Sequence, residues 1–265
     1  MSARLEPASW RPPRRTAWPI AVFIILLLGW LLGGDGSVDL EARLLGPSVS
    51  HILGTDELGR DLLRRWWLGG ARSLSLAAAL TAFHLALGLL LAVAVHRTAV
   101  LRRILLGLAD LLASVPSTLL ALLLLALLRP GLGSLVLALA LGGWIPYARL
   151  ALNRLDVLRL DASLLQTQLM GATGAHRFFR HVLPRLTPLL LAQATVGLGA
   201  VILVEGGLSF LGVGLPPDLA SWGTMLASGR AFLLVSPWTL LWPALGILLA
   251  LLAAGAWKGG LDTGS

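Results

Sequence analysis

Two acidic residues, Asp110 and Glu205, stand inside long apolar stretches of this 265-residue sequence. An ionisable side chain inside a membrane is costly in free energy, so such a residue is a candidate functional site by default. Pro116 follows Asp110 by six residues and can bend the helix that carries both. We predict Asp110, Pro116 and Glu205 as candidates for lining a transmembrane pathway. For the two acids, a structural bond or a helix-end position is the alternative.

The sequence carries no recognisable catalytic or metal-binding motif. It has no G-x-S-x-G, no H-E-x-x-H and no phosphate-binding G-x-x-x-x-G-K-[ST] loop, so it does not read as a hydrolase or an ATPase. It also has no cysteine, which excludes disulfides, cysteine-bound metals and thiol catalysis. Its histidines lack ligand spacing: His51, His84, His96, His176 and His181. We expect no catalytic residue, no metal site and no cofactor in this chain.

The composition indicates a protein that crosses a membrane several times. Hydrophobic residues make up 57% of the chain and charged residues 13%, with a mean hydropathy of +0.83. A bilayer core is crossed by about 20 apolar residues in a helix. Six stretches meet that length: 17–34, 74–95, 104–128, 134–152, 186–204 and 237–257. We predict an all-α polytopic membrane protein with six transmembrane helices, because solid Leu/Ala/Val runs do not fit the short alternating strands of a β-barrel.

The first stretch could instead be a signal peptide, because basic residues precede it. Its apolar core is longer than that of a typical signal peptide, and no clear Ala-x-Ala site follows directly. We therefore predict a retained helix at 17–34.

Basic residues set the predicted orientation. Fourteen of the 21 Lys and Arg residues fall in 1–16, 96–103, 149–185 and 258–265. In the remaining segments between spans, acidic residues balance the basic ones. Loops rich in Lys and Arg stay in the cytoplasm, so we predict that both termini are cytoplasmic. The net charge of +8 is then a topology signal and not a sign of nucleic-acid binding.

A charged strip, "GTDELGRDLLRRWW" at 54–67, lies in the predicted outer segment 35–73. Thr55 could cap a helix there, followed by two acids in the first turn and two arginines near the end, which suits the helix dipole. The strip also has acid–arginine pairs four residues apart and an apolar side ending in two tryptophans. We predict an amphipathic helix lying on the outer membrane surface in contact with lipid. A stable connector without a further role is the alternative.

A long polar segment, 153–185, interrupts the predicted five-helix core at 74–257. Gly171 and Gly174 permit a sharp reversal or a close backbone approach, and "HRFFRH" can form a short helix before Pro184 opens the next span. A partner protein could bind a short rigid helix at this surface. The alternative is a basic loop that only satisfies the orientation rule.

Several motifs in order resemble one family. These are "GTDELGRD" followed by "GARSLSL", "ADLLASVPSTLLALLL" (109–124), "MGATGAHRFFRHVLPRLTPLLL" (170–191), "ILVEGGLSFLGVGLPP" (202–217) and "SWGTML" (221–226). Together they resemble the C-type permease subunits (DppC/OppC-like) of bacterial dipeptide/oligopeptide/nickel ABC importers. The order and spacing agree from about residue 50 to the C-terminus.

The resemblance implies a type I ABC importer permease fold in the bacterial plasma membrane. It implies four kinds of partner: a homologous B-type permease, two ATP-binding subunits that hold ATP and Mg, an extracytoplasmic solute-binding protein and lipid. It also assigns residues. The coupling residues are Asp161, Gly171, Ala172, Gly174, His181 and Pro184, and the outer signature is Gly54, Thr55, Asp56, Gly59, Arg60, Asp61 and Arg72.

Some positions depart from the family pattern. Gln166 and Thr167 replace two alanines before Gly171, Arg185 replaces a common asparagine, and one extra residue precedes Arg72. The expected cargo is a di- or oligopeptide. Nickel, a metal chelate or an opine is the alternative within the same architecture, and a channel or an intramembrane enzyme is a remote one.

Overall fold

The computed structural model of this chain describes residues 27, 29, 31, 34–129 and 131–262. Its described residues are helical or irregular, apart from one isolated bridge between Thr55 and Asp61. The predicted all-α class is confirmed for this part of the chain. The predicted segment 1–16, most of the predicted first span and the last three residues lie outside the described residues.

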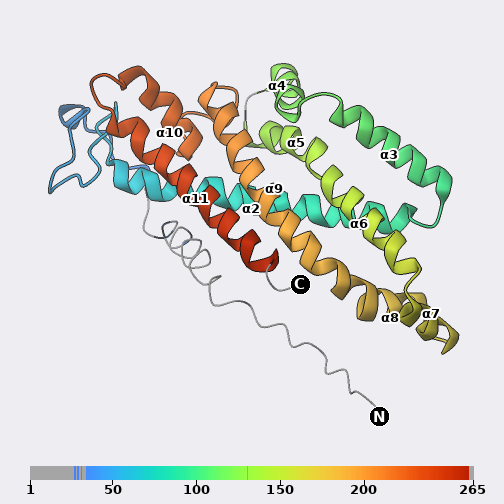
Figure 1. The fold of residues 1–265 in the computed structure, drawn as a ribbon. Helices are drawn as coiled ribbons and strands as arrows, with labels where there is room; N and C mark the ends of the chain where they lie inside the picture. The colour runs from blue at the N-terminus through green and yellow to red at the C-terminus, as the bar shows by residue number, and fades with distance from the viewer. Residues whose placement is uncertain (1–26, 28, 30, 32–33, 130, 263–265) are drawn as a thin grey trace, which may run out of the picture.

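The helices are labelled as in Figure 1. They are α2 (Leu62–Val95), α3 (Ala99–Ala113), α4 (Ser117–Leu127), α5 (Leu132–Gly143), α6 (Ile145–Arg159), α7 (Ala162–Leu169), α8 (Gly174–Arg177), α9 (Leu183–Phe210), α10 (Trp222–Gly229) and α11 (Trp238–Asp262). Three short helical turns accompany them: η2 (Leu40–Ala42) before α2, η3 (Phe178–Val182, π-helical) between α8 and α9, and η4 (Arg230–Phe232) between α10 and α11.

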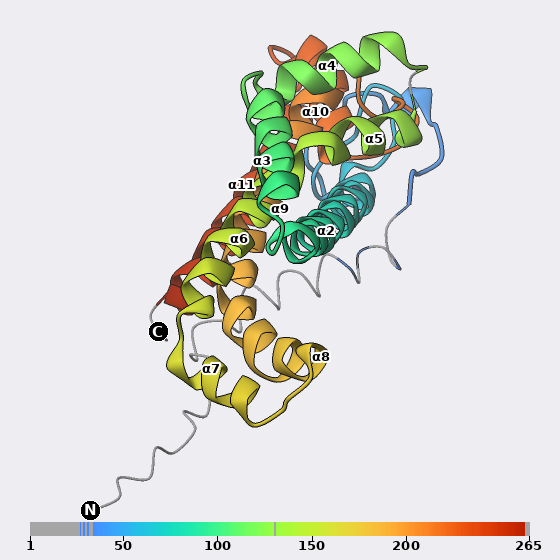
Figure 2. The ribbon, with the colours of Figure 1, turned by 90° about the vertical axis from the view of Figure 1, so that its right-hand side faces the viewer.

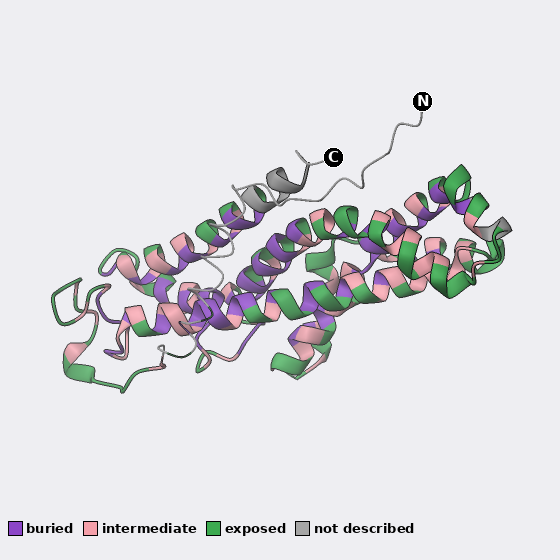
Figure 3. Ribbon diagram, turned by 90° about the horizontal axis from the view of Figure 1, so that it is seen from below, coloured by how far each residue is buried: buried purple, intermediate pink, exposed green. Residues whose placement is uncertain are grey.

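Four helical segments of the described chain are long and apolar enough to cross a membrane: Leu62–Val95, Leu132–Arg159, Gly174–Phe210 and Trp238–Gly255. The pair α3 and α4 would make a fifth if it counts as one broken span. Large apolar residues on these helices, including Leu90, Leu203 and Leu248, are exposed, as lipid contact requires. Figure 3 shows exposed positions along the helices. The described chain thus accounts for four or five of the six predicted spans.

The predicted span 104–128 is not straight. α3 and α4 meet at an angle of 81°. Ser114 ends α3, with its hydroxyl donating to the Leu111 carbonyl at 2.7 Å, and Pro116 occupies the cap position of α4. Proline has no N–H to continue the helix and steers the preceding residue out of the helical region. The predicted bend at Pro116 is therefore correct, and it is sharp enough to break the span.

The helix predicted for the strip 54–67 is wrong in its first half. Residues 54–61 form a loop, and α2 begins at Leu62 with Asp61 as its cap, accepting from the Arg64 N–H at 3.0 Å. Thr55 caps nothing; its hydroxyl instead accepts from the backbone of the preceding loop. α2 then runs without a break to Val95, so the second half of the strip begins a span and is not a separate surface helix.

Glycine explains why the first half of the strip is a loop. Gly54 and Gly59 have φ of +84° and +72°, which other residues rarely adopt. A Cβ on Gly59 would also collide with the carbonyl of Asp39, because the two backbones are in contact there. A helix through these positions would need negative φ at both glycines.

A buried ion cluster holds this loop on α2. The Asp56 carboxylate pairs with Arg60 Nε at 2.7 Å and with Arg65 Nη1 at 2.8 Å, while its other oxygen accepts the N–H groups of Leu58 and Arg60 at 2.9 Å. Asp56 and Arg65 are only 4% and 2% exposed. Each carboxylate oxygen of Asp56 therefore accepts from two donors. A buried ion pair is tolerated when its hydrogen-bonding groups are satisfied in this way.

Tryptophan indoles tie the same region together. Trp66 of α2 donates to the Trp242 carbonyl of α11 at 2.7 Å, and Trp242 donates to the Leu53 carbonyl at 3.2 Å. Trp222 at the start of α10 is fully buried and donates to the Trp66 carbonyl at 3.2 Å. Each indole therefore satisfies its N–H, with the Trp222 ring buried and the other two rings partly buried, so the loop, α2, α10 and α11 form one packed unit.

α2 separates the two ends of the molecule. Its 34 residues make a rod of about 50 Å, longer than the roughly 30 Å hydrocarbon core. The strip and α10 lie at its N-terminal end, and α7, α8 and the end of α6 lie at the other, as Figures 1 and 2 both show. A membrane around α2 therefore leaves the strip and the α7–α8 segment on opposite sides.

Replacing the central acid tests the ion cluster. We expect Asp56→Asn to lower the free energy of unfolding by about 3 kcal/mol, because two buried arginines lose their counter-charge. Thermal unfolding of the purified protein in detergent measures this loss. Glu41→Gln is the matched control, because Glu41 is exposed and loses the same charge without breaking a cluster. Equal unfolding temperatures for the two variants would contradict the role given to Asp56.

Candidate functional site

The predicted loop 153–185 is mostly helical. α6 continues to Arg159, α7 and α8 follow, and the turn η3 leads directly into α9. Pro184 is the second residue of α9, close to where the sequence predicted the span to begin. We call residues 162–177 the α7–α8 segment. It lies at the far end of α2 from the strip and projects beyond the spans (Figure 2).

A polar clamp fixes where this segment joins the spans. Asp161 pairs with Arg185 at 2.7 Å and accepts the Ser163 N–H at 2.9 Å; Arg185 also donates to the Ser163 hydroxyl at 2.9 Å. The hydrogen bonds from Ser163, helped by Arg185, lower the pKa of Asp161. Arg185 departs from the family pattern, and sequence reasoning did not find its pairing with Asp161, because 24 residues separate the two.

Gly171 forms the reversal between α7 and α8. Its φ is +84°, and no atom lies within 4 Å of where a Cβ would stand. Of the two predicted reasons for glycine here, the left-handed backbone is the one the structure shows. The Ala172 N–H donates to the Thr167 carbonyl at 3.1 Å, and Thr173 caps α8 by accepting from the His176 N–H at 3.3 Å. The turn is thus defined by backbone conformation and hydrogen bonds.

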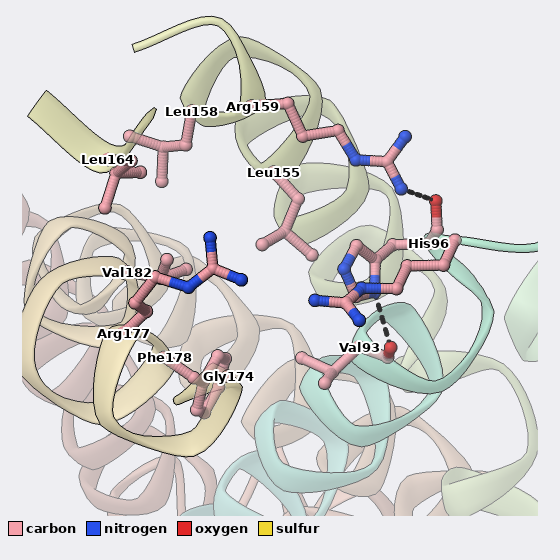
Figure 4. Close-up of a pocket in the computed structure, with 11 residues that line it drawn as sticks. Val93, His96, Leu155, Leu158, Arg159, Leu164, Gly174, Arg177, Phe178 and Val182 are labelled. Atoms are coloured by element: carbon pink, nitrogen blue, oxygen red, sulfur yellow. Dashed lines mark hydrogen bonds between the residues drawn. The ribbon is translucent and has the colours of Figure 1, made fainter. Parts of the chain in front are cut away.

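A cavity of about 470 Å³ separates the α7–α8 segment from the ends of α2 and α6 (Figure 4). Its lining is apolar with a basic rim: Val93, His96, Arg97, Leu155, Leu158, Arg159, Leu164, Gly174, Arg177, Phe178 and Val182. Arg159 donates across to the His96 carbonyl, His96 Nδ1 lies 2.6 Å from the Val93 carbonyl oxygen, and the Arg177 guanidinium points into the cavity. The segment is therefore joined firmly to α6 and α9 but is not packed tightly against α2.

His181 does not line this cavity. It lies in the turn η3, with its ring centroid 6.1 Å from that of His176. Gly174 lines the cavity and starts α8, with open space around its Cα. The predicted coupling residues thus lie along one continuous path from α6 to α9.

A second cavity, of about 440 Å³, lies deeper among the spans. The break between α3 and α4, the junction between α5 and α6, and one side of α9 all contribute to its lining. Pro116 lines it, together with His84, Tyr147 and Gln193. Of the three predicted pathway candidates, Pro116 is the one found at this cavity.

Glu205 lies elsewhere, in a buried hydrogen-bonded cluster. It is 1% exposed, and its carboxylate accepts from Ser73 at 3.2 Å, Ser209 at 2.9 Å and Ser221 at 3.0 Å. These serines belong to α2, to α9 and to the cap of α10. Glu205 therefore joins three elements at the strip end of the molecule, which fits the structural alternative given in the sequence analysis.

Asp110 also lines neither cavity. It is exposed on α3 and forms an ion pair with Arg149 of α6. The pair bridges two helices on the surface of this chain. The charge of Asp110 is therefore stabilised by Arg149.

Six of the seven outer-signature residues meet in the loop described above. Arg72 stands apart, on α2, with contacts to the Asp35 carboxylate at 3.4 Å and to the Ala220 carbonyl at 3.3 Å. It connects the chain before the strip with the entry to α10. In the part of the chain that the structure describes, no group of three His, Cys, Asp or Glu residues is placed to hold a metal ion.

Known proteins resemble most of this chain. A family model described as "Binding-protein-dependent transport system inner membrane component" matches residues 84–262. The oligopeptide transport system permease protein OppC of Bacillus subtilis (strain 168) is 35% identical over 75% of this chain and 65% of its own length. The nickel transport system permease protein NikC of Escherichia coli (strain K12) is 31% identical over 88% of each. The probable D,D-dipeptide transport system permease protein DdpC of the same strain is 34% identical over 86% of this chain and 80% of its own length.

The fold also has a counterpart among solved structures. A chain of the MetNI methionine ABC transporter in an inward-facing conformation aligns with a TM-score of 0.58 at 20% identity, over 75% of this chain and 97% of that one. At this identity the likeness shows the fold alone. The family model and the relatives agree with the resemblance found from the motifs. This multi-pass chain belongs to the family of binding-protein-dependent transport system inner membrane components, and it is a permease subunit of an ABC importer and not itself an enzyme.

Proposed function

We propose that this chain forms one half of the translocation pathway of an ATP-driven importer of di- or oligopeptides. A homologous B-type permease forms the other half, two ATP-binding subunits hold ATP and Mg, and an extracytoplasmic binding protein delivers the solute. Relatives named as oligopeptide and D,D-dipeptide permeases support the peptide class. The nickel permease NikC is nearly as similar and supports nickel as the second candidate.

The observation that carries the coupling role is the path from the α7–α8 segment into α9. The Asp161–Arg185 ion pair locks the start of α7 to the start of α9, and η3 joins α8 to α9 without a gap. α9 then runs 22 residues from Leu183 to Glu205, about 33 Å. A displacement of the segment by an ATP-binding subunit therefore moves one rod that reaches the opposite end of the molecule.

Glu205 is where that rod is fastened at the other end. Its three serine partners connect α9 with α2 and α10, so a shift of α9 is passed to the elements beside the strip. The helices would have two alternative arrangements. ATP would bind more tightly to the complex in one of them and so raise its population, which is a population shift. In this account Glu205 is a fastening point, and the pathway is lined by other residues.

The orientation follows from the charges. We place the α7–α8 segment and both termini in the cytoplasm, and the strip outside. The arginines near the α7–α8 segment then obey the positive-inside rule.

Because the natural chain has no cysteine, single cysteines report this orientation directly. Val49 is fully exposed beside the strip, and Met170 is 85% exposed at the α7–α8 turn. We expect an impermeant thiol reagent to label Val49→Cys in intact cells and Met170→Cys only after the membrane is opened. Labelling of Met170→Cys in intact cells would reject the orientation.

Glu205→Ala tests the fastening point. We expect a loss of about 3 kcal/mol in unfolding free energy, because three buried serine hydroxyls lose their acceptor together. Glu205→Gln keeps the side-chain length and one carbonyl oxygen, so its loss should be roughly 1 kcal/mol. Thermal unfolding and uptake are measured on the same preparations. A normal unfolding temperature with abolished uptake in Glu205→Ala would assign this residue to the pathway instead.

Gly171→Ala tests the coupling turn. Alanine at φ +84° costs about 1–2 kcal/mol, although space is available, so the turn must change its conformation. We expect normal insertion but reduced co-purification of the ATP-binding subunits and reduced ATP hydrolysis in the reconstituted complex. Gly107→Ala is the control, because Gly107 is equally open and lies in α3 without positive φ. Full co-purification and hydrolysis in Gly171→Ala would remove the coupling role from this turn.

A further inference from the structure

Two hydroxyls and one imidazole nitrogen within the spans are among the buried atoms that have no hydrogen-bond partner among the described residues. They are Thr81 Oγ1 and His84 Nε2 on α2, and the Tyr147 hydroxyl on α6. The three residues are 5%, 3% and 1% exposed. A hydroxyl or imidazole without a partner is costly in an apolar medium, and lipid supplies no partner. Such groups are retained where something polar reaches them.

The deeper cavity borders two of these three residues. Its lining includes His84 and Tyr147, and also two glycines that touch them. Gly143 lies against the His84 ring, and Gly197 lies against the Tyr147 hydroxyl with Thr81 Cγ2 3.8 Å from the site of its absent Cβ. A side chain at either glycine would take the space of the polar group. The small residues thus allow polar groups to stand at the cavity wall between closely packed helices.

The lining also includes a helix N-terminus. α4 starts at Ser117, and its cap residue Pro116 supplies no side-chain hydrogen bond. The first turn of a helix presents N–H groups and a partial positive charge, which favours carboxylate or carbonyl oxygens. Pro116 and Ser117 both line the cavity, and Gln193 on α9 brings an amide to it.

We infer that this cavity is a solute-contact site that receives the carboxylate and amide groups of a peptide-like solute during passage. The inference rests on the proposed function and narrows its substrate class. Hydroxyls and amides can donate to or accept from a peptide backbone, and the α4 terminus suits its carboxylate. A free divalent cation would find one imidazole and, among the described lining residues, no carboxylate. The volume of about 440 Å³ is that of a small-molecule site.

Equilibrium retention of radiolabelled tri-alanine by the purified complex tests this inference. The complex contains both permeases and the ATP-binding subunits in lipid nanodiscs, without the binding protein. The variants are Tyr147→Phe, in the lining, and Thr81→Val, next to Gly197 of the lining; each removes one unpartnered hydroxyl. Thr195→Val is the matched control, because Thr195 is a buried threonine on α9 whose hydroxyl already donates to the Ala192 carbonyl at 2.8 Å.

We expect each of the two variants to weaken retention about fivefold, as for the loss of one hydrogen bond. Their unfolding temperatures should be unchanged or higher, since each loses a buried hydroxyl without a partner; a merely structural hydroxyl would lower the temperature on removal. Thr195→Val should retain tri-alanine as the natural complex does. Unchanged retention in both variants, no retention by the natural complex, or saturable retention of Ni²⁺ that tri-alanine does not displace would each overturn the inference. If the ATP-binding subunits still co-purify in that case, the proposed function stands and only the solute-contact site falls.

Discussion

Lipid offers no hydrogen bonds, so every polar group on the long helices must find its partner inside the protein or at a cavity. At the packed end of the molecule, several buried polar side chains find partners on other elements. Asp56 meets two arginines, Glu205 meets three serines, and the indole of Trp66 meets a carbonyl of α11. Each of these contacts crosses between elements, so satisfying the polar groups also fixes how the helices are arranged. Two of the groups without a partner are then informative, because His84 and Tyr147 both line one cavity.

The two ends of the molecule differ in how tightly their elements pack. At the strip end, ion pairs and indoles lock the loop, α2, α10 and α11 into one body. At the other end, a cavity of about 470 Å³ lies between the α7–α8 segment and α2, while the Asp161–Arg185 clamp attaches the segment to α9. A segment attached to one rod and separated from its neighbour can pass on a displacement without unpacking the core. α9 is that rod, and its far end is fastened at Glu205.

Local features of the structure could be predicted from the sequence. The apolar runs gave the helices, Pro116 gave the bend, Pro184 the start of α9, and Gly171 a backbone with positive φ. Each of these depends on one residue and its neighbours in the chain. Gly54 and Gly59 carried the same kind of signal for a loop, but the acid–arginine spacing of the strip suggested a helix and was misleading, since Arg65 pairs with Asp56 nine residues away. The partners of Glu205 and the Arg185–Asp161 clamp are long-range contacts, and no local pattern indicates them. For the same reason His84 and Tyr147, which line the deeper cavity, could not be grouped before the fold was known.

The central claim is that the α7–α8 segment receives the motion of an ATP-binding subunit. Photocrosslinking tests it most directly, with a benzophenone maleimide attached to a cysteine at Met170, the exposed tip of this segment, in the assembled complex. The account predicts an adduct with an ATP-binding subunit from this position, with a yield that changes when ATP is bound, and no such adduct from the same probe at Val49 beside the strip. An adduct with the ATP-binding subunit from Val49, or none from Met170 in a complex that hydrolyses ATP, would contradict it.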